Sequence, residues 1–167
     1  MPPDMHWLAE AARLYDDDGK VGLRDRRQLI RLVARLHKRI PTDLPWCGLF
    51  VGHCMLTAFP DQRLPWLWVR GRPWRRYGRP AEPQLGAILV FWLRWQNSPF
   101  GHVGFYWGED EDTYHVLGGN QHRSILIERF PKHRLIDCRW PPGIATPGIR
   151  RRHPPAAAAP FEHADAG

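Results

Sequence analysis

The sequence has few cysteines and no long apolar run, and both shortages restrict what the protein can be. Three cysteines among 167 residues are too few, and odd in number, for a disulfide framework. No stretch holds the roughly 18 consecutive apolar residues of a transmembrane helix. The first residues include acids and lack the apolar core of a secretory signal peptide. We therefore expect a domain that folds without disulfide bonds and does not span a membrane.

Acidic residues are also in the minority. The chain has 24 Lys and Arg against 17 Asp and Glu, a net charge of +7 and a pI near 9.9, which favours a polyanionic partner such as nucleic acid, an acidic wall polymer or an anionic membrane face. The segment 64–80 carries five arginines and three tryptophans and no acid. Its prolines and glycines predict a loop with at most short helical turns.

Two different periodicities divide the rest of the chain. Apolar residues at helical spacing predict helices over 5–15, over 24–40, where the outer face is basic, and from about residue 46. From Gly86 onward the pattern changes, and five short strands are expected: AILVFWL, HVGFYWG, TYHVLGG, SILIERF and RLIDCRW. These elements predict an α+β fold in which N-terminal helices pack on an antiparallel sheet of about five strands.

The length suits one domain, which we place at residues 1–146. The segment 147–167 is of low complexity and has few residues that could join a core. We expect it to be a disordered tail.

Cys47 stands where a Pro-Trp turn meets the apolar stripe of the third helix, and we expect it at the exposed end of that helix. A helix N-terminus carries partial positive charge and unpaired N–H groups, which stabilise a thiolate and lower its pKa toward neutrality. Cys47 is therefore the candidate nucleophile. His53 and Cys54 lie nearby but lack the spacing of a zinc site, so we expect them to pack in the core and predict no metal.

His102 opens the second predicted strand and is the candidate base. If the strands on either side of the acidic turn at 109–112 pair antiparallel about residue 111, Asn120 lies opposite His102 and can fix its tautomer. The neighbouring Gln121 is the alternative partner. In this hypothesis Cys47 attacks a carbonyl carbon, His102 activates the thiol and protonates the leaving amine, and the amide of Cys47 helps to hold the oxyanion.

Five short motifs occur in one order along the chain: Trp46-Cys47, Gly71-Arg72-Pro73, Pro83-Gln84-Leu85-Gly86, Gly101-His102-Val103-Gly104 and Leu117-Gly118-Gly119-Asn120-Gln121. In these motifs the chain resembles the papain-like cell-wall hydrolases of the NlpC and CHAP kind, over roughly residues 5–141. The resemblance implies a papain-like fold with Cys47 as nucleophile, His102 as base and Asn120 as the orienting residue. It also implies substrate contacts from Trp46, Trp74 and Gln121, and no cofactor.

Two features depart from this family. Neither a glutamine nor a tyrosine shortly precedes Cys47, which leaves the second oxyanion donor unassigned. The acidic cluster at 16–18 lies about thirty residues before Cys47 and lacks the spacing of calcium ligands.

The resemblance implies a monomeric peptidoglycan hydrolase, of the endolysin or secreted antibacterial effector type, that cuts an amide or peptide bond of the stem peptides. Without a signal peptide it would act in the periplasm or wall after lysis, release through a holin or specialised secretion. Secretion machinery or an immunity protein would then be a further partner.

Two alternatives stay open: a basic binding protein for nucleic acid or wall glycan in which the cysteine is incidental, and a cysteine transferase or deamidase acting on protein. Dependence on the thiol separates the first alternative from the enzymes.

Overall fold

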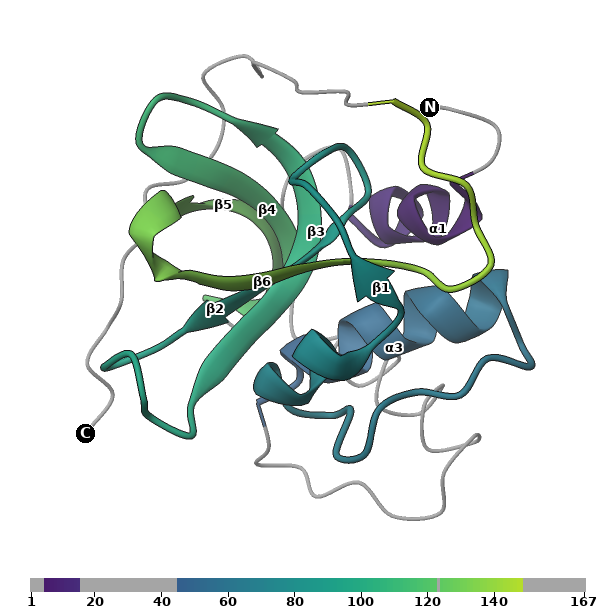
Figure 1. Ribbon diagram of the computed structural model, residues 1–167, viewed down its shortest axis with the longest axis horizontal. Coiled ribbons are helices and arrows are strands. Elements are labelled where there is room, and N and C mark those ends of the chain that lie inside the picture. The colour runs from purple at the N-terminus through teal and green to yellow at the C-terminus, as the bar shows by residue number, and fades with distance from the viewer. Residues whose placement is uncertain (1–4, 16–44, 123, 149–167) are drawn as a thin grey trace.

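A computed structural model of the chain describes residues 5–15, 45–122 and 124–148, and within them the fold is α+β. Two α-helices, α1 (His6–Leu14) and α3 (Cys47–Ala58), lie on one side of a strongly curved antiparallel sheet (Figure 1). Both helices were predicted. The helix expected over 24–40 and the tail after residue 148 lie outside the described residues. Within the described residues no helix is long and apolar enough to cross a membrane.

The sheet has six strands in the order β1-β6-β2-β3-β4-β5. The five predicted strands correspond to β2 (Ile88–Trp92), β3 (Gly101–Glu109), β4 (Thr113–Gln121), β5 (Ser124–Pro131) and β6 (Leu135–Trp140). The sixth strand, β1 (Arg79–Pro80), pairs with the end of β6. It was missed because two residues show no alternation of apolar and polar side chains. Two short 3-10 helices, η1 (Arg72–Arg76) and η2 (Lys132–Arg134), complete the described elements.

The two faces of β3 serve different layers. Phe105 points toward the helices, and its ring centroid lies 6.0 Å from that of Phe50 in α3. His102, three residues earlier, points to the other face and stacks on Phe130 of β5. Successive side chains of a strand alternate between faces, and β3 pairs with β2 without a bulge from residue 101 to 105. The first residues of β3 therefore present Phe105 to the helices and His102 to the opposite face of the sheet.

The short helix α1 is held by specific contacts of its buried residues. The indole Nε1 of Trp7 donates a hydrogen bond of 2.9 Å to the carbonyl of Gly86, just before β2. Glu10 accepts a hydrogen bond of 2.8 Å from His53 of α3, and Cys54 beside it is fully buried. His53 and Cys54 thus pack in the core, as predicted. A nine-residue helix is marginal in isolation, so these contacts account for its presence in the fold.

Candidate functional site

Cys47 is the first residue of α3, as predicted, but it is not exposed. Its relative exposure is 2 %, and the segment 67–71 lies over the first turn of the helix beside it. A Cβ atom added at Gly48 would come within 2.6 Å of the carbonyl oxygen of Val69, so only glycine permits this backbone contact. The expectation of an exposed thiol was therefore wrong, because a loop distant from the helix start in sequence folds back onto it.

The expected lowering of the Cys47 pKa is also wrong for the isolated protein. Burial raises the pKa of the thiol to about 11. The backbone amides of Val103, Gly48 and Cys47 itself act in the opposite direction by hydrogen bonding to the sulfur, but they do not offset the loss of solvation. The contact with Val103 is the informative one, because the amide of Val103 belongs to the peptide bond that joins it to His102. The sulfur of Cys47, the candidate nucleophile, thus lies at the start of β3.

We expect the stability of the protein to fall as the pH rises from about 9 toward 11. The folded state holds the Cys47 thiol proton more tightly than the unfolded chain, where the pKa is about 9, so the thiol's contribution is complete below pH 9 and lost as the pH passes 11. Urea unfolding between pH 8 and 11 measures the effect. The fall should be smaller in Cys47→Ala, and an equal fall in both proteins would contradict it.

His102 is held from two sides in the interior of the sheet. Its Nε2 atom lies 3.1 Å from Oε1 of Gln121, and its ring stacks on Phe130 with centroids 4.7 Å apart and an interplanar angle of 10°. The amide nitrogen of Gln121 donates to the carbonyls of Val116 and Leu126, at 3.2 and 3.0 Å. The side-chain oxygen of Gln121 must therefore be the acceptor toward the imidazole. Nε2 of His102 then carries the hydrogen, and the lone pair of the neutral ring is on Nδ1.

The predicted register between β3 and β4 is confirmed in the middle of the hairpin. Phe105 pairs with Leu117 and Tyr106 with Val116, both centred on residue 111, and the register shifts by one nearer the turn. Beyond Leu117 the two strands are not paired. There Asn120 adopts a left-handed conformation, with φ of 62°, and the pairing of β4 with β5 is irregular between Gly118 and Gln121.

This irregularity breaks the alternation of side chains along β4. The hydrogen bond to His102 is consequently made by Gln121, the partner that the sequence left as the alternative to Asn120. Gln121 is buried, whereas Asn120 is half-buried. A role for Asn120 in orienting His102 stays a prediction.

Gly118 leaves the space in which His102 and Gln121 meet. A Cβ atom at this position would lie 3.0 Å from Nε2 of His102 and would collide with the side-chain oxygen of Gln121. We expect Gly118→Ala to displace Gln121 and to destabilise the fold by about 1–3 kcal/mol, the usual cost of overpacking. Thermal unfolding and the imidazole resonances of His102 measure both effects. Gly148→Ala is the matched control, because its added Cβ meets nothing within 4 Å; an equal response would contradict the prediction.

The predicted substrate residues Trp46 and Trp74 are buried. Trp74 donates a 2.7 Å hydrogen bond to the carbonyl of Trp68 and so holds the loop that covers α3. Trp46 packs its ring over Gly119, and its indole N–H has no hydrogen-bond partner among the described residues. Contact of these two side chains with a substrate stays a prediction that their burial argues against. Gln121, the third predicted substrate residue, is engaged with His102.

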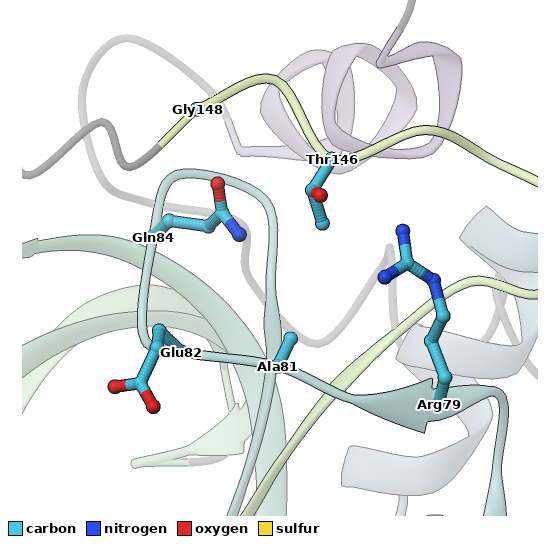
Figure 2. Close-up of a pocket in the computed structure, with 6 residues that line it drawn as sticks. All are labelled: Arg79, Ala81, Glu82, Gln84, Thr146 and Gly148. Atoms are coloured by element: carbon cyan, nitrogen blue, oxygen red, sulfur yellow. The ribbon is translucent and has the colours of Figure 1, made fainter.

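A shallow hollow elsewhere on the surface does not belong to this site. It is lined by Arg79, Ala81, Glu82, Gln84, Thr146 and Gly148. Figure 2 shows the guanidinium of Arg79 and the amide of Gln84 on opposite sides of the hollow. Gln84 precedes β2, whereas His102 pairs with Phe91 near the other end of that strand, so the hollow and the Cys47 region lie at opposite ends of β2.

No group of three or more His, Cys, Asp or Glu side chains that could hold a metal ion occurs in the described part of the chain.

No protein family, curated protein or solved structure matches the chain. The likeness to cell-wall hydrolases therefore depends on the sequence motifs.

Proposed function

We propose that the protein is a cysteine hydrolase of papain-like architecture that cleaves an amide or peptide bond of peptidoglycan stem peptides. The observation that carries the proposal is the contact of the Cys47 sulfur with the backbone amide of Val103, which places the thiol beside the main chain of His102. The Cys47 sulfur meets the amide of Val103, and the adjoining His102 is held by Gln121 in the tautomer whose lone pair is on Nδ1. A thiol at a helix start, an imidazole and an orienting amide are the parts of such a site.

In the proposed reaction Nδ1 of His102, which lies on the face of β3 away from α3, takes the thiol proton through one bridging water, and the sulfur attacks the carbonyl carbon of the substrate. The amide N–H of Cys47 stabilises the resulting oxyanion. The carbon–nitrogen bond then breaks, and the imidazolium returns its proton to the departing amine. Water, deprotonated by Nδ1, attacks the thioester, and the released sulfur recovers a proton from His102. Throughout the cycle Gln121 accepts the Nε2–H bond and keeps the ring oriented.

The raised pKa of the Cys47 thiol is compatible with this sequence of steps. A buried thiolate alone is unfavourable, but a thiolate formed together with an imidazolium ion is stabilised by the opposite charge. Proton transfer to His102 therefore creates an ion pair instead of an isolated charge. The choice of peptidoglycan as substrate is supported by the five motifs and by the basic surface, which favours association with an anionic wall.

The burial of Cys47 also favours a second candidate, a basic binding protein in which the cysteine only packs. An inert core thiol has low exposure and a raised pKa. Cys47 has both properties, with a relative exposure of 2 %. The two candidates differ in one property, since only the hydrolase needs the thiol.

Digestion of purified sacculi by the full-length protein tests the proposal. Soluble fragments should appear with the native protein, and none should appear after its thiols have been alkylated under denaturing conditions and the protein refolded. Mass spectrometry of the fragments identifies the bond that is cut. Binding to sacculi without the release of fragments would overturn the proposal in favour of the binding protein.

A further inference from the structure

The exposed large apolar side chains of the described residues gather in two segments. They are Trp66, Leu67, Trp95 and Phe100, with exposures of 87, 48, 56 and 44 %. We name these four residues the aromatic surface. Trp66 and Leu67 lie in the loop between α3 and η1, and the other two lie in the loop between β2 and β3. Exposed apolar side chains grouped in this way mark a binding site more often than isolated ones do.

Both segments adjoin the candidate site. The first continues into the backbone that covers Gly48, and then into Gly71, whose added Cβ would come within 2.9 Å of the carbonyl carbon of His102. The second leads directly into Gly101 and His102 at the start of β3. In Figure 1 both loops lie along the lower side of the molecule. The loops that carry the aromatic surface therefore run beside Cys47 and His102.

Arg72 joins the two segments. Its guanidinium donates one hydrogen bond to the carbonyl of Ser98 and another, of 3.0 Å, to the carbonyl of Gln96. The guanidinium of Arg94 lies 4.4 Å above the ring of Phe100 and restrains it. The aromatic side chains are thus presented by loops that are tied to each other.

The surroundings of the aromatic surface are cationic. Arg70, Arg75, Arg76 and Arg94 are exposed, and no acid occurs in 62–81 or 83–108. Rings with open faces stack on sugars and on nucleobases alike, and arginines attract either carboxylates or phosphates. The neighbouring thiol and imidazole decide between these ligands, because that pair attacks carbonyl carbon, which a polynucleotide backbone lacks.

We propose that the aromatic surface binds the sugar strand of the substrate, and that the bond cut is the amide between a sugar's acid side arm and the first amino acid of the stem peptide. This inference rests on the proposed function and specifies its substrate. Stacking of the sugar rings on Trp66 and Trp95 would bring the adjoining amide to the segment 67–71 that lies over Cys47, and this segment must shift for the sulfur to reach the amide. The exposed arginines would receive the carboxylates of the peptide.

The test combines product analysis with binding. Products of sacculi digestion should carry a free carboxylate on the sugar and a free amino terminus on the first amino acid of the peptide. Binding is measured with N-acetylglucosamine hexamer in a Cys47→Ala background. Trp66→Ala and Trp95→Ala should each weaken binding about tenfold. Trp66→Phe and Trp95→Phe keep a ring and are the matched controls, which should stay within about threefold of the parent.

Each departure from this result has a defined meaning. New ends inside the stem peptide, or hexamer binding unchanged by the alanine variants, would overturn the inference and leave the hydrolase standing. Single-stranded DNA binding that is lost in the alanine variants, without hexamer binding, would assign the surface to nucleic acid instead. Digestion that persists in Cys47→Ala would overturn the proposed function itself.

Discussion

Replacing Cys47 with alanine should reduce peptidoglycan hydrolysis by roughly a thousandfold or more, because no other group in the site can form the thioester. Dye release from labelled sacculi measures the rate. The side chain of Cys47 is small, so the far-UV circular dichroism of the variant should match that of the native protein. Cys47→Ser should be equally inactive, since a hydroxyl is a much weaker nucleophile at neutral pH.

Cys54 and Cys138 are the matched controls for this prediction. Both are buried and free, and burial raises the pKa of each thiol, that of Cys138 to about 12. Cys54→Ala and Cys138→Ala should lower the free energy of unfolding while leaving the rate of hydrolysis by the folded fraction nearly unchanged. If Cys47→Ala digested sacculi at a rate close to the native one, the cysteine-hydrolase proposal would have to be abandoned.

Loss of the His102 imidazole should cost about as much as loss of Cys47, because the two groups act as a unit and their effects do not add. His102 also packs in the core, where its ring stacks on Phe130, so His102→Ala risks a folding defect. His102→Phe avoids this difficulty, because it keeps an aromatic ring beside Phe130 and removes the base. We expect His102→Phe to fold and to be inactive, and the double variant with Cys47→Ala to be no worse than either single variant.

Gln121→Ala should cost roughly ten- to a hundredfold, since it removes the acceptor that selects the tautomer of His102 but leaves both reacting groups. Asn120→Ala should cost less than Gln121→Ala, because the hydrogen bond to His102 is made by Gln121. The rate of dye release as a function of pH checks the tautomer argument. Its lower limb, which reports the imidazole, should move in Gln121→Ala; a larger loss in Asn120→Ala than in Gln121→Ala would contradict the assignment.

Much of the fold is predictable from local pattern. Helix α3 was expected because apolar residues recur at helical spacing from Cys47 onward, and β2 to β6 were expected because short apolar runs are separated by turn residues. The central register of β3 and β4 also follows from the sequence, since an acidic turn between two runs of equal length defines their midpoint. These features depend on residues close together in the chain.

The hydrogen-bond partner of His102 is Gln121, one position after the expected Asn120. Simple alternation places Asn120 opposite His102. A left-handed residue at Asn120 and an irregular pairing with β5 turn the next side chain toward the imidazole instead. Left-handed conformations of asparagine are sterically allowed but are not required by the sequence, so the periodicity alone could not reveal this one.

By itself, the sequence of this protein determined which residues begin the third helix and the second predicted strand, and so which thiol and which imidazole are candidates. Only the tertiary structure decided how these groups are surrounded. The backbone of Trp68 and Val69 lies against Gly48, Cys47 is buried, and Trp74 anchors the covering segment from the core. Solvation controls the pKa of a thiol, and solvation is set by residues that are distant in the chain. Helix and strand periodicity carry no information about such contacts, which arise when separate elements pack together.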